Sequence, residues 1–194
     1  MISINVRGKK VVFIVASNGY HEIEYGIPKA ILEQSGVKVI TASDKPDGAV
    51  AKDKSTTPVD ITLDKIKVTD YDGIFFIGGP GALDCLDNST SYHIISEAKK
   101  HEIPYGAICI SPRILAKAYG LQGKRATGWN GDNALETIFK SFDVTYVTRD
   151  NVVVDGLVVT ATGPKAAKEF AQGIMQVLAK KISQPKLSKR NSWR

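Results

Sequence analysis

The chain has 194 residues, of which 24% are charged, and a formal net charge of +6 at pH 7. This length suits a single domain, which can bury roughly 70% of the surface of the unfolded chain. Four basic residues in the last eleven (Lys186, Lys189, Arg190, Arg194) leave a net charge of about +2 on the rest of the chain. The charge therefore favours a basic, solvated tail over a nucleic-acid arm, and we expect no nucleic-acid partner.

No apolar run approaches the roughly 18 residues of a membrane span, and Met1 to Lys10 lacks the pattern of a signal peptide. The two cysteines, Cys85 and Cys109, lie far apart, without the spacing of a disulfide framework or a CxxC metal site. We therefore expect a cytoplasmic protein in a reducing setting, with no membrane association and no metal.

Strand-like and helix-like patterns alternate along the chain, which predicts an α/β fold with a mainly parallel sheet and helices on both faces. Strands are expected at residues 11–16, 37–42, 73–77, 105–108, 125–127, 144–147, 151–154 and 157–161. Helices are expected at 21–35, from a cap within 87–90 to about 101, after 109 to about 119, at 132–140 and at 165–181.

Three segments depart from this alternation. Residues 43–70 are polar and contain prolines, which indicates a small hairpin-like insertion at the sheet edge. Asp155-Gly156 is a two-residue hairpin turn between the last two strands. Residues 1–183 are expected to form one domain, with 184–194 as a basic tail.

Cys109 follows a short apolar run, Tyr105 to Ile108, and precedes a helix-like pattern. Pro112 fits the first turn of that helix, where the missing N–H of proline has no partner to lose. The spacing predicts a sharp strand-to-helix turn at Cys109, similar to a nucleophile elbow. The partial positive charge of the helix end would favour a thiolate there. The alternative is a small buried hydrophobe without chemistry.

The Cys109 turn, Ser17 to Glu24 and Gly78 to Gly81 all follow predicted strands, where α/β sheets form their sites. Together with their flanks they resemble the PfpI/ThiJ superfamily. The matching segments are EIEYGIP (22–28), YDGIFFIGGPGA (71–82), AICISP (107–112), LQGKRAT (121–127) and VVVDGLVVTATGP (152–164). The resemblance implies a flavodoxin-like three-layer sandwich, a homodimer or higher homo-oligomer, and no cofactor.

The resemblance also implies a reactive Cys109 beside a carboxylic acid, which maps onto Glu24. Glu24 could instead be an exposed helix carboxylate, although the flanking Glu22 fits that description better. The implied oxyanion site uses the backbone N–H groups of Gly79 and Ile110. Glycine at position 79 could equally serve a tight turn, and both roles are compatible.

This chain departs from the family pattern around the elbow. Ile110 follows the cysteine where many members have a histidine, and Trp129 stands where another branch has one. Trp129 could line the pocket, or pack in the core or at a dimer interface. Ser111 replaces a common glycine, which narrows the turn or adds a hydroxyl near the sulfur. His21 lies in the Glu24 loop and could reach the pocket.

The other histidines, His93 and His101, fall in or just after a predicted surface helix. Without a histidine base, a Cys-His peptidase mechanism loses its proton acceptor. Cys85 follows the Gly-rich loop and is interpreted as a packing residue, with a redox role as the alternative.

Two function classes remain from the sequence. The first is a cofactor-free enzyme of glyoxalase III or deglycase type, in which Cys109 attacks a small 2-oxoaldehyde and Glu24 moves protons. The second is a cysteine-based oxidative-stress sensor or chaperone without turnover. Hydrolase or hydratase activity is a weaker third. Both leading hypotheses predict a Cys109 pKa below about 7, against an ordinary value of about 8.5.

Overall fold

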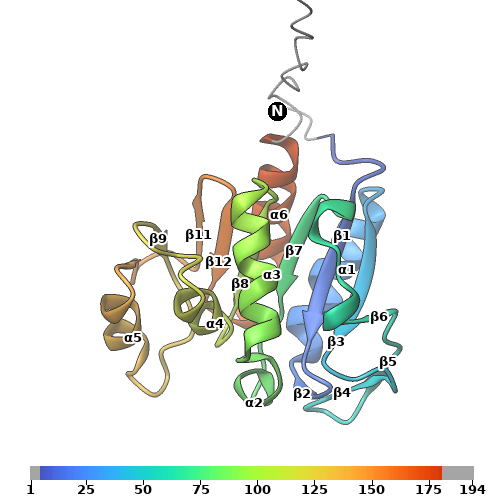
Figure 1. The fold of residues 1–194 in the computed structure, drawn as a ribbon, viewed down its shortest axis with the longest axis horizontal. Helices are drawn as coiled ribbons and strands as arrows, with labels where there is room; N and C mark the ends of the chain where they lie inside the picture. Colours follow the sequence, from blue (N-terminus) through green and yellow to red (C-terminus); the bar gives the residue numbers. More distant parts are fainter. Residues whose placement is uncertain (1–4, 181–194) are drawn as a thin grey trace, which may run out of the picture.

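The computed structural model describes residues 5–180 and has three layers, a central sheet between two layers of helices (Figure 1). Within these residues, the central sheet has seven strands in the order β11-β12-β8-β7-β1-β3-β6. Their bounds are β1 Lys10–Val15, β3 Lys38–Ser43, β6 Ile61–Thr62, β7 Gly73–Phe76, β8 Tyr105–Ile108, β11 Val152–Asp155 and β12 Val158–Ala161. Among the described strands of this sheet, only β11 and β12 pair antiparallel.

The five strands β3-β1-β7-β8-β12 follow the flavodoxin-like order 2-1-3-4-5. The chain leaves β1 toward β3 on one side and later returns to β7 on the other, so the switch point lies between β1 and β7. Loops after these strands diverge and leave room for a ligand. The predicted fold class is confirmed.

Two small sheets flank the central one. The first has the order β2-β4-β5, with β2 Asn18–Tyr20, β4 Ala49–Ala51 and β5 Thr56–Thr57. The second pairs β9 Arg125–Ala126 with β10 Thr145–Tyr146. The expected insertion at 43–70 therefore divides in two: its hairpin β4–β5 pairs with β2, and only β6 extends the edge of the main sheet. Figure 1 shows β2 and β4 at the end of the sheet toward which β1 runs.

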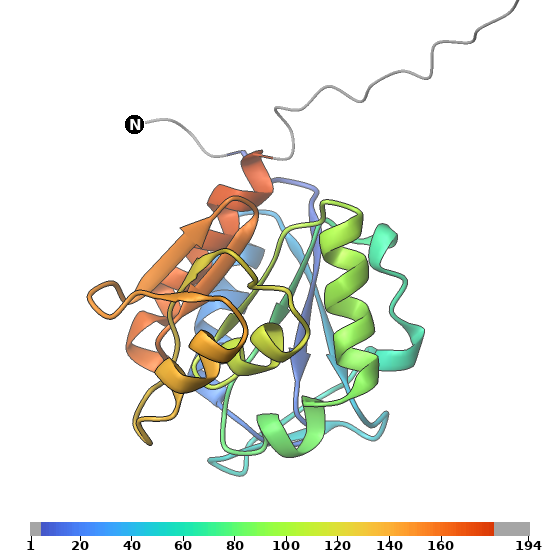
Figure 2. The ribbon, with the colours of Figure 1, turned by 60° about the vertical axis from the view of Figure 1, so that its left-hand side comes forward.

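The helices are divided between the two faces of the sheet, as Figure 2 shows from a second side. Helix α1 packs against α6 on one face, and α3 with α4 lies on the other. Their bounds are α1 Glu22–Gln34, α2 Ala82–Leu86, α3 Ser89–Lys100, α4 Pro112–Lys117, α5 Leu135–Ser141 and α6 Ala167–Lys180. Three short 3-10 turns occupy Leu63–Lys65, Val68–Asp70 and Pro164–Ala166.

Several predicted boundaries are confirmed, including strand β8 at both ends and the hairpin turn at Asp155-Gly156. Helix α5 begins later than predicted, because Asp132 and Asn133 form a turn in front of it. Asn133 has a positive φ of 59°, and the Asp132 carboxylate accepts a hydrogen bond from the Ala134 N–H at 3.1 Å. Local patterning could not separate this turn from the helix that follows.

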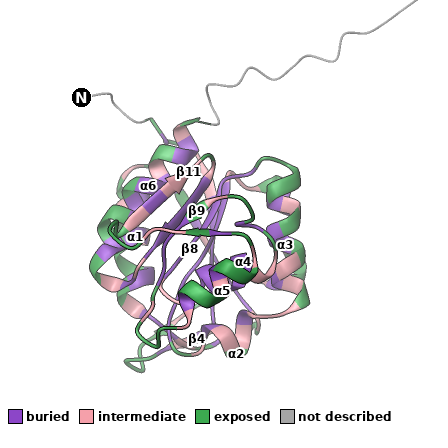
Figure 3. Cartoon of the chain, turned by 90° about the vertical axis from the view of Figure 1, so that its left-hand side faces the viewer, coloured by how far each residue is buried: buried purple, intermediate pink, exposed green. Residues whose placement is uncertain are grey.

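The core lies on both faces of the sheet, and Figure 3 shows buried strands between helices whose outer faces are exposed. Phe75 on β7 is fully buried and makes edge-to-face contacts with Phe13 on β1 and Phe170 on α6, at ring-centroid distances of 6.3 and 6.2 Å. The pair with Phe170 joins the sheet to α6, and the pair with Phe13 joins two neighbouring strands.

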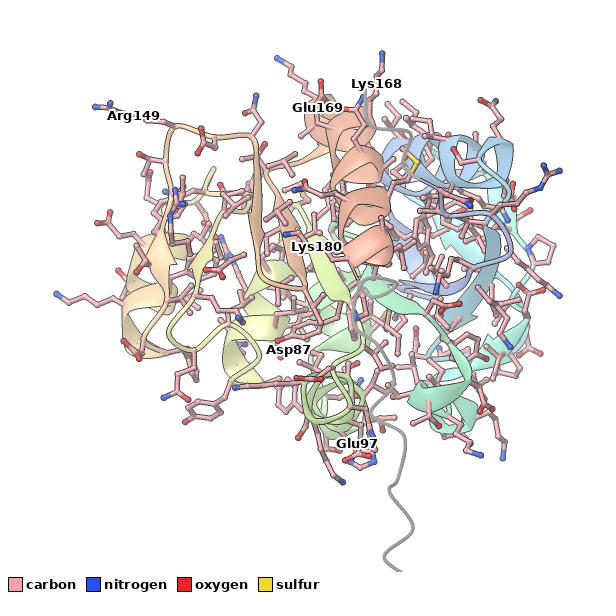
Figure 4. All side chains as sticks on the ribbon, turned by 90° about the horizontal axis from the view of Figure 1, so that it is seen from above. Asp87, Glu97, Arg149, Lys168, Glu169 and Lys180 are labelled. Carbon is pink, nitrogen blue, oxygen red and sulfur yellow. The ribbon has the colours of Figure 1, made fainter. Side chains whose placement is uncertain are left out.

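Charged side chains gather on the outside, where Figure 4 shows Arg149 and Lys168 pointing away from the fold. None of the described helices combines the length and apolar character that crossing a bilayer requires. The basic tail predicted at residues 184–194 lies outside the described residues.

Candidate active site

The loops after β1, β7 and β8 meet at one end of the sheet. The His21 N–H donates to the Gly78 carbonyl at 2.9 Å, and the Gly81 N–H donates to the Gly19 carbonyl at 3.1 Å. The Cys109 N–H donates to the Ala161 carbonyl at 2.9 Å, which joins the elbow to β12. The structure thus brings together the three loops that the sequence singled out.

Cys109 stands on a strained turn, with a positive φ of 65°. A non-glycine residue in this region costs about 1 kcal/mol or more and persists only where its surroundings hold it. Pro112 opens α4 directly afterwards, as expected. The Ser111 hydroxyl donates to the Ile77 carbonyl at 2.8 Å, which ties the elbow to the end of β7. Ser111 is therefore buried, and its hydroxyl proton is used by the Ile77 carbonyl.

Glu24 lies in the first turn of α1 and is fully buried. Neither carboxyl oxygen has a hydrogen bond of good geometry among the described residues. Gly78 lies between Glu24 and Cys109, and its lack of a side chain lets the two residues come close together. A Cβ at Gly78 would lie 2.5 Å from the Cys109 Cβ and 2.6 Å from Glu24 Oε2. The alternative of an exposed helix carboxylate at Glu24 is wrong.

Burial raises the pKa of Glu24 to about 7, and contacts with the Cys109 thiol and the Gly78 backbone offset this only in part. Burial and the nearby Glu24 charge raise the pKa of the Cys109 thiol to about 12. The expectation of a Cys109 pKa below about 7 therefore lacks support, because burial outweighs the helix end. The pair carries at most one negative charge at neutral pH, so a thiolate requires the proton on Glu24.

The backbone N–H groups of Gly79 and Ile110 both interact with the Cys109 sulfur and act to lower its pKa. These are the two donors that the resemblance implied for an oxyanion site. Gly79 has φ of 122°, and a Cβ there would lie 2.4 Å from the Gly19 carbonyl oxygen. Glycine is therefore required for the turn that brings this N–H to the sulfur.

A pocket of about 240 Å3 opens above the sulfur. It is lined by His21, Lys52, Gly79, Pro80, Cys109, Ile110 and Trp129. Its volume is that of roughly eight water molecules in the liquid. A small substrate could therefore reach the sulfur with both backbone donors beside it.

His21 reaches this pocket, but its Nδ1 accepts a hydrogen bond from the Ile23 N–H at 3.3 Å. Burial and the Lys52 charge lower the pKa of His21, so the ring is neutral at pH 7 and its proton lies on Nε2. In this tautomer His21 offers the pocket a donor and no free basic nitrogen. It caps α1 rather than replacing the missing histidine base.

Trp129 forms one wall of the pocket and is 38% exposed, so it is not a core residue. The backbone N–H of Trp129 donates to the Cys109 carbonyl at 2.7 Å. The guanidinium of Arg113 lies over the indole ring and also donates to the Trp129 carbonyl, at 3.3 Å. Arg113 is buried and pairs with Asp132 at 2.6 Å, and it holds the pKa of Asp132 at about 2. The sequence did not indicate this clamp.

Lys52 is a pocket residue that sequence reasoning missed. It follows β4 in the 43–70 segment, and its N–H donates to the Tyr20 carbonyl at 2.8 Å. A lysine in a polar insertion looks like any solvated lysine, and only the pairing of β4 with β2 brings it to the pocket.

The remaining candidates lie elsewhere. His93 and His101 are exposed on α3 or just after it, as predicted. Cys85 is partly buried in α2, with its sulfur 3.9 Å from the Ser17 hydroxyl. No cluster of three or more histidine, cysteine or acidic side chains within residues 5–180 could hold a metal ion.

A cysteine on a strained strand-to-helix turn at the carboxyl end of a parallel sheet defines the class of α/β proteins with a nucleophile elbow. The family model of the DJ-1/PfpI family matches residues 9–177, and the chain belongs to this family. The superfamily predicted from the five motifs is confirmed.

Relatives and solved structures agree with this assignment. An uncharacterized protein of Methanocaldococcus jannaschii is 31% identical over 177 residues, covering 91% of this chain and 85% of its own length. One from Staphylococcus aureus is 30% identical, with coverage of 87% and 98%. DJ-1beta of Drosophila melanogaster has a TM-score of 0.79 at 26% identity, with coverage of 88% and 90%. A ThiJ/PfpI domain protein from Brachyspira murdochii, at 24% identity, shares the fold with a TM-score of 0.83 and coverage of 90% and 98%.

Proposed function

We propose that the protein is a cysteine-dependent, cofactor-free enzyme that converts small 2-oxoaldehydes to 2-hydroxy acids, with related deglycase activity. One observation carries this proposal: the buried carboxyl of Glu24, whose closest polar contact is the Cys109 thiol, has a pKa of about 7. Such a group can accept and return protons at neutral pH, which this isomerisation requires.

In the first step the thiol proton passes to Glu24 while the sulfur bonds to the aldehyde carbon. The carbonyl electron pair moves to the oxygen, and the N–H groups of Gly79 and Ile110 stabilise the resulting oxyanion. The oxyanion then takes the proton from Glu24, which gives a neutral hemithioacetal. Glu24 returns to the carboxylate and serves as the base for the next step.

In the second step Glu24 removes the proton from the former aldehyde carbon, forming an enediolate, and returns it to the adjacent carbon. The proton of the hemithioacetal hydroxyl passes to the former ketone oxygen, so that the carbon bonded to sulfur becomes a carbonyl. The product is a thioester of a 2-hydroxy acid on Cys109. Water then cleaves the C–S bond, which releases the hydroxy acid and restores the thiol. The net reaction adds one water to the 2-oxoaldehyde, with no external oxidant or reductant.

Purified protein should convert methylglyoxal to lactate, and Cys109→Ser should reduce kcat/KM by at least about 10³-fold because the nucleophile is lost. Cys85→Ser is the matched control, and it should keep nearly full activity. Lactate is measured by chromatography to separate turnover from simple thiol trapping. An equal rate from Cys109→Ser would refute the proposal.

Oxidation sensing is a second candidate, favoured by the accessible Cys109 sulfur in the pocket. A DJ-1 from Toxoplasma gondii, 26% identical with a TM-score of 0.76, has been solved in an oxidized form. Here peroxide would take the thiolate to sulfenic acid, releasing hydroxide. A second peroxide would give the sulfinic acid and water. Protonated Glu24 would donate a hydrogen bond to a sulfinate oxygen.

Mild peroxide followed by mass spectrometry tests this candidate. Cys109 should gain two oxygen atoms before Cys85 changes, and Glu24→Gln should slow the second addition. Preferential oxidation of Cys85 would contradict the sensor hypothesis.

A Cys-His peptidase finds little support, since His21 has no free basic nitrogen in the pocket.

A further inference from the structure

A second pocket adjoins the one above Cys109. It has a volume of about 310 Å3, and both pockets include Lys52 and Pro80 in their walls. Lys54 lines only the outer pocket. The two hollows are therefore neighbours along one surface, with the Lys52 side chain at their junction. A substrate bonded to the sulfur could extend toward this lysine.

The position of Lys52 is fixed by backbone pairing. Its N–H donates to the Tyr20 carbonyl at 2.8 Å, next to the buried residue Ala51 in β4. The Lys54 N–H in turn donates to the Ala51 carbonyl at 3.0 Å, which closes a turn. The Lys52 ammonium makes no ion pair among the described residues. The backbone of Lys52 is thus held in place, and its exposed ammonium at the pocket wall is suited to bind an anion.

The charges around the Cys109 pocket favour the same kind of ligand. Among the described residues that line it, Lys52 carries the single fixed charge, because His21 is neutral. The buried Glu24 carboxyl interacts electrostatically with Lys52 but lies outside the lining residues, and the other nearby acids also lie outside them. Asp53 accepts hydrogen bonds from the Ser55 N–H and hydroxyl at 2.9 and 2.6 Å, and Asp84 lines only the outer pocket. Glu22 lies beside His21 and outside the lining residues.

We propose that Lys52 is a specificity-determining residue that binds a carboxylate or phosphate on the substrate, so that the preferred substrates are anionic 2-oxoaldehydes. This inference rests on the proposed function and names its substrate class. A three-carbon aldehyde leaves much of the 240 Å3 pocket empty. A 2-oxoaldehyde with an anionic group a few atoms from the carbonyl places its charge toward Lys52 while the aldehyde meets Cys109.

A matched pair of aldehydes tests this selectivity. 4,5-Dioxopentanoate carries a carboxylate where 2-oxopentanal carries a methyl group, and both present the same 2-oxoaldehyde to Cys109. The wild-type protein should prefer the anionic aldehyde. Lys52→Gln should reduce the ratio of the two kcat/KM values about five- to tenfold. This is the size of effect expected from losing one charge-assisted hydrogen bond at a site partly exposed to solvent. The loss should lie in KM for the anion.

Lys52→Arg should keep the preference because it keeps the charge, and Lys54→Gln is the matched control outside the Cys109 pocket. Raising the salt concentration should weaken the preference in the wild type and leave Lys52→Gln unaffected. An unchanged ratio in Lys52→Gln, or an equal fall in Lys54→Gln, would overturn the proposal. Dioxopentanoate phosphonate analogues separate carboxylate from phosphate recognition.

A binding measurement separates this inference from failure of the proposed function. Levulinate has the carboxylate but no aldehyde, and 2-pentanone is its neutral counterpart. Levulinate should protect Cys109 from alkylation by neutral iodoacetamide more than 2-pentanone does, and Lys52→Gln should abolish the difference. If neither aldehyde turns over but levulinate protects, the anion site stands and the enzyme fails. If levulinate gives no Lys52-dependent protection, the anion site falls.

Discussion

Cys109 and Glu24 act as one titrating unit, because each raises the cost of a second charge in the same buried volume. Burial raises the Glu24 pKa to about 7, and burial with the Glu24 charge raises the Cys109 pKa to about 12. A free thiolate would suit simple nucleophilic attack. A thiol beside a carboxylate instead suits attack coupled to proton transfer. This is why the proposed reaction begins with a proton moving to Glu24.

The raised Glu24 pKa makes folding stability depend on pH. The unfolded chain ionises Glu24 at its ordinary pKa near 4.5, whereas the folded protein holds the proton up to about 7. The unfolded state therefore loses its proton first as pH rises, and stability falls between these two values. At about 1.4 kcal/mol per pKa unit, the loss is about 3 kcal/mol at most.

Glu24→Gln should remove this dependence, because glutamine does not ionise. We expect the free energy of unfolding at pH 7.5 to rise by about 1–3 kcal/mol and its decline between pH 5 and 7.5 to flatten. Urea titrations at several pH values measure this. Glu22→Gln, at the neighbouring partly buried acid, is the control, and it should keep the wild-type decline. A decline of equal slope in Glu24→Gln would show that Glu24 ionises normally.

At the scale of elements, the site depends on the loop after β7 being thin enough to lie between α1 and the elbow. Gly78 is the residue of this loop that contacts both Glu24 and the elbow. A Cβ at Gly78 would also lie 2.8 Å from the Ile108 carbonyl oxygen. Backbone and a short β-carbon cannot yield as the end of a long side chain can. The contact between Glu24 and Cys109 thus depends on Gly78, which takes no part in the proposed reaction.

Gly78→Ala should separate Cys109 from Glu24 and lower methylglyoxal turnover at least about 10²-fold, because proton transfer needs direct reach. The far-UV circular dichroism should stay close to that of the wild type. Gly26→Ala on α1 is the control, since its Cβ would meet nothing within 4 Å. It should stabilise the helix by about 0.5–1 kcal/mol and keep activity. Full activity in Gly78→Ala would refute the role given to this contact.

At the scale of the whole molecule, one continuous core joins both helical layers to the sheet, and Phe75 is one of its fully buried members. Phe75→Ala should lower the free energy of unfolding by about 3–5 kcal/mol, because it leaves a cavity between β1, β7 and α6. Ile23→Ala, at a side chain 42% exposed, should cost less than about 1 kcal/mol. Equal losses in the two variants would mean that the core does not pack as described.

The homo-oligomer implied by the resemblance stays a prediction.

The sequence by itself determined the order of the main strands and helices, the sharp turn at Cys109 and the three loops that follow the strands, but not the short elements β2 and α2. These features are encoded locally, through apolar runs, Pro112 at a helix start and glycines in tight turns. Glu24, Gly79 and Ile110 could be nominated because their motifs are short and contiguous. The later start of α5 was missed, since its turn depends on a carboxylate held by a distant arginine.

Only the tertiary structure decided what surrounds the sulfur. Burial of Glu24 and Cys109 reversed the expected pKa of the thiol, and burial is a property of the packed layers rather than of any segment. Lys52 reached the pocket through the pairing of β4 with β2, and Arg113, which is paired with Asp132, contacts Trp129 directly. Charge, desolvation and pocket walls come from residues distant in the sequence, so local patterns carry no record of them.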